Sequence, residues 1–138
     1  MSECVLCARK TGPGGEEVLW EGSRCRVILA DEAGFPGFCR VVWNDHVAEM
    51  TDLSPADRGH VMSVAYAVEG ALRDLMSPDK VNLAALGNMV PHIHWHVVPR
   101  FRDDPTFPGS PWSPVQRDAP DRSADPGALR AAIAAALA

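Results

Sequence analysis

Residues 91–98 alternate histidines with apolar residues, and this alternation constrains the fold more than any other feature of the chain. Successive side chains of a β-strand point to opposite faces, so the pattern predicts a strand with three imidazoles on one face and three apolar side chains on the other. The histidines are His92, His94 and His96. They would lie ~6.6 Å apart along the strand. The segment therefore predicts one chemical face and one core face.

Four further stretches have the short, apolar, β-branched composition of strands. They are residues 18–20, 25–30, 38–43 and 81–86. A turn at 34–37 joins the second stretch to the third, which predicts an antiparallel hairpin. Together with the histidine strand, these stretches predict an antiparallel sheet of about five strands.

Two helices and a coil complete the predicted elements. The sequence at 54–57 places Ser at the cap, Pro at the first helical position and Asp in the first turn, which predicts a long helix that Ser-Pro at 77–78 ends. Asp-Pro at the start of 125–138 predicts a short helix with little to pin it. Five prolines within 102–123 predict a coil laid over the body. The expected fold class is α+β.

Composition narrows the class of protein. The chain has 138 residues, 46% hydrophobic and 22% charged, as expected for one globular domain. Its net charge of -5 is opposite to the basic surface of a dedicated nucleic-acid binder, so nucleic acid is not an expected partner. No stretch approaches the ~20 apolar residues of a membrane span, and residues 1–4 lack the features of a secretory signal. We therefore expect a cytoplasmic protein without a membrane partner.

A row of imidazoles can serve two kinds of chemistry. Imidazole is a nucleophile at neutral pH when one ring nitrogen is deprotonated and the other N–H is held by an acceptor. Alternatively, a His-x-His pair on a strand can chelate zinc and, with a third ligand, activate water for hydrolysis. The alternation by itself is compatible with both mechanisms.

The sequence from His92 to Val98 resembles the motif of the histidine triad (HIT) superfamily of nucleotide hydrolases and transferases. The resemblance extends over roughly residues 4–112 and implies a HIT-like fold. It makes residues 1–112 a histidine triad domain with an N-terminal Cys-x-x-Cys clasp, and residues 113–138 a tail and short helix of the same domain. Members of the superfamily usually pair as homodimers, so a homodimer is expected.

The resemblance implies catalytic roles for the three histidines. His94 would attack the α-phosphorus of a nucleoside phosphate derivative and form a nucleotidyl-histidine, which water or another acceptor then resolves. His96 would hydrogen-bond the phosphate and the leaving group, and the backbone near His92 would hold the other ring nitrogen of His94. His92 itself would have a structural or metal-binding role. No metal cofactor would be required for catalysis.

A nucleotide-binding set is also implied by the resemblance. Asp31 matches the position at which the superfamily places a carboxylate on the ribose hydroxyls, although an Asp there could simply form a turn. Asn82, Gly87 and Asn88 match its phosphate-side contacts, although either Asn could cap a turn. Met89 stands where better-known members commonly offer a hydroxyl to the leaving group, which puts proton delivery to an amine in doubt.

Cys4 and Cys7 have the spacing of half a tetrahedral zinc site, which needs two further nitrogen or sulfur ligands. His46 and His92 are the candidates, and some histidine triad proteins bind structural zinc through residues that match all four positions. The alternative is a reduced thiol pair without metal. A site closed by four protein ligands would stabilise the fold and leave no position for catalytic water.

These observations leave three functions to compare. The first is an enzyme of the nucleotidyl-histidine type that acts on a dinucleoside polyphosphate, a phosphoramidate or an adenylylated compound. The second is a metal-dependent hydrolase with zinc on triad histidines, although no acidic residue closely flanks the triad. The third is a catalytically silent nucleotide-binding protein. Trp112 could pack over a base, in a dimer groove or in the core.

Overall fold

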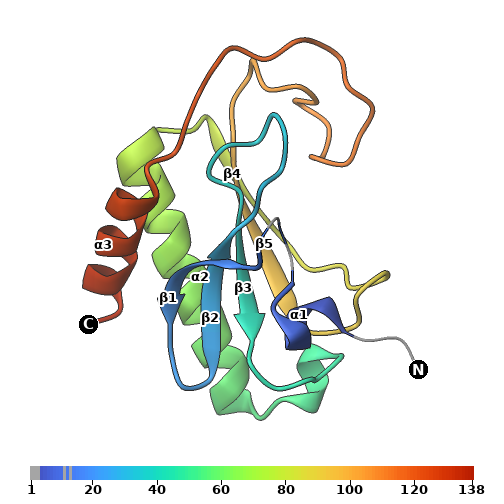
Figure 1. Ribbon diagram of the computed structural model, residues 1–138, viewed down its shortest axis with the longest axis vertical. Coiled ribbons are helices and arrows are strands. Elements are labelled where there is room, and N and C mark those ends of the chain that lie inside the picture. The colour runs from blue at the N-terminus through green and yellow to red at the C-terminus, as the bar shows by residue number, and fades with distance from the viewer. Residues whose placement is uncertain (1–3, 11, 13) are drawn as a thin grey trace.

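The computed structural model describes residues 4–10, 12 and 14–138, and it has the α+β fold that the sequence predicts (Figure 1). Five strands form one antiparallel sheet in the order β1-β2-β3-β5-β4. The strands are β1 (Glu17–Glu21), β2 (Cys25–Leu29), β3 (Cys39–Trp43), β4 (Lys80–Ala84) and β5 (His94–Arg100). The predicted hairpin of β2 and β3 is confirmed. Residues 1–3, which belong to the stretch where no secretory signal was expected, lie outside the described residues.

Local sequence signals set the bounds of the helices. The helices are α1 (Val5–Ala8), α2 (Pro55–Met76), α3 (Pro126–Ala136) and the short 3-10 helix η1 (Met50–Asp52). Ser54 caps α2 as predicted, since its hydroxyl accepts from the Asp57 amide over 3.1 Å. Ser77 ends α2 in the left-handed region, with φ of 49°. Among the described residues, no helix combines the length and the hydropathy needed to cross a membrane.

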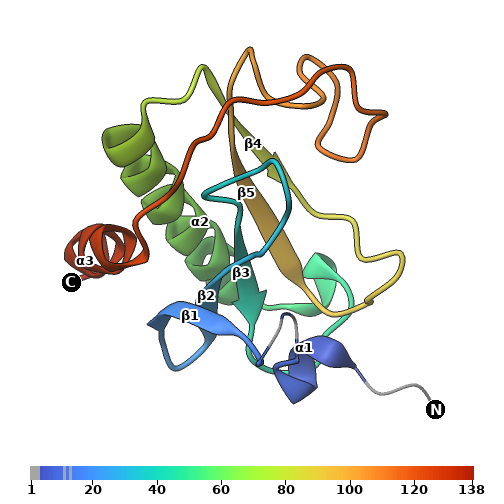
Figure 2. The same cartoon turned by 45° about the horizontal axis from the view of Figure 1, so that its top comes forward.

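One face of the sheet is buried against α2 and α3. Val27, Val41 and Val97 have no exposed surface, and they belong to the main hydrophobic cluster together with Val61 and Val68 of α2. Figures 1 and 2 show α3 beside α2, and the two helices are in contact. The alternation of the strands therefore builds the core on this face, as the sequence predicts.

The opposite face carries the histidines. Residues that oppose each other on antiparallel strands point to the same face, and the register pairs Arg40 with His96 and Val42 with His94. Leu6 of α1 packs with strand residues at one end of this face. The coil that follows β5 lies at the other end, as Figure 2 shows. The histidines of β5 therefore lie between the N-terminal segment that contains α1 and the coil that follows β5.

Two strand ends differ from the prediction. The histidine strand begins at His94, later than predicted, because the His92 amide donates to the Val90 carbonyl in a tight turn. His92 is therefore not part of a row of three on one strand. At the other strand, β4 ends at Ala84, and Leu86 is 58% exposed where a sheet residue was expected.

The C-terminal helix begins at its predicted cap, but the prediction that little pins it is wrong. The Asp125 carboxylate accepts from two amides of the first turn. Leu129 and Ile133, one helical turn apart, are buried in the main hydrophobic cluster. Arg130 adds an exposed ion pair with Glu17 of β1 at 3.6 Å. Burial of the Leu129–Ile133 stripe therefore fixes α3 against α2 and β1.

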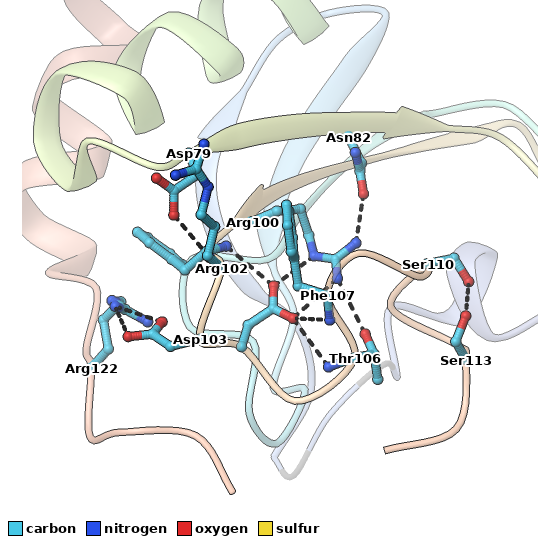
Figure 3. Close-up of polar contacts among 12 residues, drawn as sticks. Asp79, Asn82, Arg100, Arg102, Asp103, Thr106, Phe107, Ser110, Ser113 and Arg122 are labelled. Atoms are coloured by element: carbon cyan, nitrogen blue, oxygen red, sulfur yellow. Dashed lines mark hydrogen bonds and ion pairs between the residues drawn. The ribbon is translucent and has the colours of Figure 1, made fainter. Parts of the chain in front are cut away.

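A buried ion pair, which was not predicted from the sequence, holds the coil after β5 against the sheet (Figure 3). Arg100 and Asp104 are each 2% exposed. Arg100 Nε and Nη2 donate to the two carboxylate oxygens of Asp104 over 2.7 and 3.0 Å. The same guanidinium donates to Asn82 Oδ1 over 2.8 Å and to Thr106 Oγ1 over 3.2 Å. Arg100 therefore joins β4, β5 and the coil.

The Asp104 carboxylate is also bound by the backbone. It accepts hydrogen bonds from the amides of Phe101, Thr106 and Phe107. Burial raises the pKa of this carboxyl, but the hydrogen bonds from Arg100 and the three amides outweigh burial and lower the pKa of Asp104 below its ordinary 3.8. The carboxylate is therefore charged at neutral pH, with the coil folded around it.

Candidate functional site

His94 and His96 lie side by side on β5. Their ring centroids are 4.9 Å apart and the ring planes are nearly perpendicular, at 87°. His94 Nδ1 lies 2.6 Å from the carbonyl oxygen of His92. Because a carbonyl can only accept, the neutral His94 ring carries its proton on Nδ1 and its lone pair on Nε2. This geometry leaves His94 Nε2 available as a nucleophile.

The surroundings keep both imidazoles neutral. Burial lowers the pKa of His94 and the positive charge of Arg40 lowers it further, while the hydrogen bond to the His92 carbonyl acts in the opposite direction. Burial, His94 and Arg40 together lower the pKa of His96 to about 3. Both rings are therefore uncharged at pH 7, the state in which a ring nitrogen can attack or accept.

His92 belongs to a second cluster of side chains. Its Nε2 lies 2.5 Å from the carbonyl oxygen of Trp43, so the proton of the neutral ring sits there and Nδ1 carries the lone pair. That Nδ1 lies 3.4 Å from the sulfur atoms of both Cys4 and Cys7, and 3.3 Å from Nδ1 of His46. The turn at His92 thus directs one triad histidine to a different task from the other two.

The second cluster has the donors and the dimensions of a zinc site. The ligand atoms of Cys4, Cys7, His46 and His92 all lie within 4.8 Å of one another. Two sulfurs and two nitrogens form a structural zinc set, with bonds of about 2.3 and about 2.0 Å. At tetrahedral angles such bonds separate two nitrogens by about 3.3 Å, a sulfur and a nitrogen by about 3.5 Å, and two sulfurs by about 3.8 Å. The distances of 3.3 and 3.4 Å in the cluster fit that geometry.

Neighbouring groups orient the ligands of this cluster. Cys4 occupies the N-cap of α1, and its sulfur accepts from the Cys7 amide over 3.5 Å. Leu6, between the two cysteines, is 2% exposed and anchors α1 on the sheet. The Trp43 carbonyl fixes the tautomer of His92, as hydrogen-bond partners of metal-ligating imidazoles commonly do. Four residues from three parts of the chain could therefore hold one ion.

The structure does not gather the predicted nucleotide-binding residues in one cavity. Asp31 is exposed and lines a cavity of about 710 Å³ between the turn after β2 and residues 117–124. Asn82 lines a separate cavity of about 310 Å³ beside Trp112, and its side-chain oxygen is bound by Arg100. Gly87 and Asn88 lie in the loop between β4 and β5, where Gly87 has φ of 77°. Neither cavity is lined by a triad histidine.

Two further side chains contact His96. The Trp112 ring lies 5.0 Å from the His96 ring, so the coil supplies one wall beside it. Arg40 Nε lies 3.4 Å from His96 Nδ1 and donates to it. Sequence reasoning missed Arg40, although the predicted hairpin and the alternation within 38–43 would have placed it on the histidine face.

The chain is similar to known proteins in both sequence and fold. The sequence model of the HIT domain matches residues 15–103, more than half of the chain. Among functionally curated proteins, none matches the sequence significantly. Solved histidine triad proteins share the fold. One from Marinobacter aquaeolei VT8 is 28% identical with a TM-score of 0.70, and the match covers 88% of each chain. One from Bradyrhizobium japonicum is 26% identical with a TM-score of 0.68, with the same coverage of both chains.

One structural relative is described as zinc-bound. A Zn-bound histidine triad family protein from Mycobacterium smegmatis is 28% identical to this chain, with a TM-score of 0.69. The match covers 96% of this chain and 94% of that chain. This chain and that relative are therefore similar over nearly their whole length.

Proposed function

Because the chain belongs to the HIT domain family, we propose that it is a nucleotide hydrolase or nucleotidyl transferase acting at the α-phosphorus of a nucleoside phosphate derivative. One observation carries the proposal: the His92 carbonyl holds His94 Nδ1, which leaves the Nε2 lone pair exposed to an incoming phosphorus. The lowered pKa of His94 supports it, because the ring stays unprotonated at neutral pH.

The reaction divides into two displacements. His94 Nε2 donates its lone pair to the α-phosphorus, and the bond from phosphorus to the leaving group breaks, giving a nucleotidyl-histidine. The positive charge that forms on the His94 ring is stabilised by the His92 carbonyl at Nδ1. Water or another acceptor then attacks the phosphorus, loses a proton to solvent, and returns the electron pair to His94.

The leaving group is the least constrained part of this scheme, and the loop between β4 and β5 favours one class. Met89 of that loop is 95% exposed and carries no hydroxyl that could protonate an amine. A polyphosphate leaving group departs as a stabilised anion and needs no such proton. We therefore propose phosphoric anhydrides, including dinucleoside polyphosphates, in preference to phosphoramidates.

For the second cluster, we propose structural zinc closed by four protein ligands. The fit of Cys4, Cys7, His46 and His92 supports this assignment, as does the Zn-bound relative. When bound, zinc would supply folding energy by tying α1 to the start of β5. A metal-dependent hydrolysis on triad histidines is less well supported, because of the three only His92 lies in the cluster.

We also propose a homodimer. β4 is an edge strand of the sheet that the described residues form, and Tyr66 of α2 is 58% exposed. Sedimentation equilibrium over a range of protein concentrations tests this proposal. A monomer at all concentrations would contradict it.

Intact-protein mass spectrometry tests the catalytic proposal. Wild type, His94→Ala and the control His60→Ala, which changes a histidine on α2, are quenched without acid after exposure to adenylyl and guanylyl substrates. We expect a nucleotidyl adduct on wild type and His60→Ala only, and a loss of turnover in His94→Ala of about 10³-fold or more. Chelator-sensitive hydrolysis without an adduct would favour the metallohydrolase. Binding without adduct or turnover would favour a silent binding protein.

A further inference from the structure

Three arginines lie on the histidine face of the sheet, and two of them are saturated by protein acceptors. Arg26 is 1% exposed, and it donates twice to Glu16 and once to the Leu6 carbonyl. Arg100 is 2% exposed, and its acceptors are those of the buried network described above. Both guanidinium groups are therefore structural, with their charge neutralised inside the fold.

Arg40 differs from these two arginines. It lies on β3 directly opposite His96, and its side chain is 17% exposed. Its single ion pair among the described residues joins Nη2 to Glu32 Oε1 over 3.0 Å, and the Glu32 side chain is 45% exposed. An ion pair with so exposed a partner contributes little and is readily exchanged. In the described part of the chain, Nη1 of Arg40 has no hydrogen-bond acceptor.

Arg40 also lies over the Phe38 ring, with its guanidinium carbon 5.2 Å from the ring centroid, and it contacts His96 of the catalytic pair. Its Nε donates to His96 Nδ1 over 3.4 Å, so the neutral His96 ring carries its proton on Nε2. His96 lies beside His94, with ring centroids 4.9 Å apart. The Arg40 guanidinium therefore lies beside two uncharged imidazoles and has N–H donors that no acceptor among the described residues uses. Such a group is suited to binding an anion beside His94 and His96.

We propose that Arg40 binds the phosphate group of the nucleotide at the phosphorus that His94 attacks. The inference rests on the proposed function, because it takes the ligand to be a nucleotide. On binding, a phosphate oxygen would take the place of Glu32 at the guanidinium, and a second oxygen would meet the free Nη1 donors. Arg40 would then offset the negative charge on the non-bridging oxygens during both displacements.

A second consequence concerns His96. With Nδ1 occupied by Arg40, His96 Nε2–H is left to donate toward the same phosphate. Arg40 thus acts on substrate directly and also selects the tautomer of its neighbour. Arg40→Lys keeps the charge but lacks the planar fork, so it is expected to recover only part of the function.

Calorimetric titration of zinc-saturated protein tests the proposal, with AMP and GMP compared against adenosine and guanosine. In Arg40→Met, AMP or GMP is expected to bind about 10-fold or more weakly, and the matching nucleoside within about twofold of wild type. Arg24→Met is the control, because Arg24 is an exposed arginine whose partners, Asp57 at 3.3 Å and His60 at 3.0 Å, both belong to α2 and not to the triad. Glu32→Gln is expected to tighten AMP binding by about twofold, since it releases Arg40.

Each result decides the role of Arg40. Equal weakening of nucleotide and nucleoside in Arg40→Met, or no weakening of either, overturns the proposal. If Arg40→Met does not fold, Arg40→Lys and Arg40→Gln give the same comparison, with Lys expected to bind AMP more tightly than Gln. Wild type that binds AMP without ever forming a His94 adduct would defeat the catalytic proposal alone, and the comparison would still decide Arg40. Wild type that binds none of the four probes would overturn both.

Discussion

The N-terminal segment that contains α1 and the coil that follows β5 both lie on the histidine face, and they are held to the sheet in different ways. At the N-terminal end, α1 meets the turn before β5 through two thiols and two imidazoles, whose ligand atoms all lie within 4.8 Å of one another. At the C-terminal end, the coil is held by Arg100, which is paired with Asp104 and hydrogen-bonded to Asn82 and Thr106. The first cluster is a set of possible metal ligands, and the second is an ion pair neutralised within the chain.

The two ends differ in whether the protein alone provides all the groups that stabilise them. The Arg100 network satisfies its own donors and acceptors, so its contribution to stability needs no ligand. If the N-terminal cluster binds zinc as proposed, its contribution to stability depends on the zinc concentration and on the pH. The two ends also reach different members of the triad, because His92 belongs to the metal cluster and Trp112 of the coil packs on His96.

The largest effect on the free energy of unfolding is expected from disrupting the Arg100–Asp104 network. Arg100→Leu leaves the buried Asp104 carboxylate without its cation, and it should lower the free energy of unfolding by about 3 to 5 kcal/mol. Urea denaturation of the zinc-saturated protein measures the change. Arg102→Leu is the matched control, since Arg102 is exposed and only two residues away; we expect its effect to stay within about 0.5 kcal/mol. Equal effects of the two variants would show that the network is dispensable.

Removing metal from the cluster at the N-terminal end should lower the free energy of unfolding by a smaller amount. Free zinc at 100 times its dissociation constant stabilises the folded chain by about 2.7 kcal/mol. We expect this gain in wild type, its loss in Cys7→Ser, and its survival in Arg100→Leu, because the two ends share no ligand. Thermal unfolding with and without chelator measures all three. A zinc gain that disappears in Arg100→Leu would mean that the ends are coupled through β5.

The contributions of the two ends to stability should depend differently on pH between 8 and 5. Zinc ligands must be deprotonated, so the zinc gain should shrink on acidification from pH 8 to 5, by about 1.4 kcal/mol per pH unit for each proton taken up. The pKa of Asp104 is lowered below 3.8, so the stability that it contributes is present above that value and is lost only as the pH falls through the folded pKa. In wild type this contribution is therefore constant between pH 5 and 8. In Arg100→Leu the opposing hydrogen bond is lost and burial raises the pKa of the Asp104 carboxyl, so the destabilisation should be largest near pH 8 and should shrink toward pH 5.

The triad adds a pH dependence that is common to all these variants. The pKa of His96 is lowered to about 3, so between pH 6.5 and that value the unfolded chain binds a proton that the folded chain excludes. Stability from this source falls as the pH falls, equally in wild type and Cys7→Ser. Unfolding free energies measured at matched pH values and subtracted between variants remove it. A destabilisation by Arg100→Leu that grows on acidification toward pH 5 would contradict the assignment to Asp104.

The sequence predicted those parts of the molecule whose signals are local. The Ser cap and Pro at 54–55 predicted α2, and strand alternation predicted the core face and the opposite polar face. The cysteine spacing, together with the resemblance, predicted the set that the structure brings within 4.8 Å. These features depend on capping, on the period of a strand and on a motif, and each can be read within a few residues.

The parts that the sequence did not predict depend on contacts between distant residues. β5 begins late because the His92 turn is fixed by the Trp43 carbonyl, which lies far away in the sequence. No local signal in the sequence marks Arg100 and Asp104 as buried, and only the fold buries them. The docking of α3 did have a local signal, since Leu129 and Ile133 are spaced by one helical turn.

The smallest effect is expected at Trp112, where the C-terminal end meets the triad. Trp112 is 49% exposed and contacts His96 and Phe38 by its ring edge or face, at centroid distances of 5.0 and 6.2 Å. Aromatic pairs of this kind contribute about 0.5 to 1.5 kcal/mol, so Trp112→Ala should lower the unfolding free energy by that amount and Trp112→Phe by less. Urea denaturation followed by circular dichroism measures both.

Combining this change with Arg100→Leu decides whether the network positions the indole. If Arg100 holds the coil that carries Trp112, the indole contact is already lost in Arg100→Leu, and adding Trp112→Ala should cost almost nothing further. Full additivity of the two changes would instead mean that Trp112 reaches His96 without the network. In that case the C-terminal end would act on the triad through the indole alone, and its buried ion pair would serve only the stability of the coil.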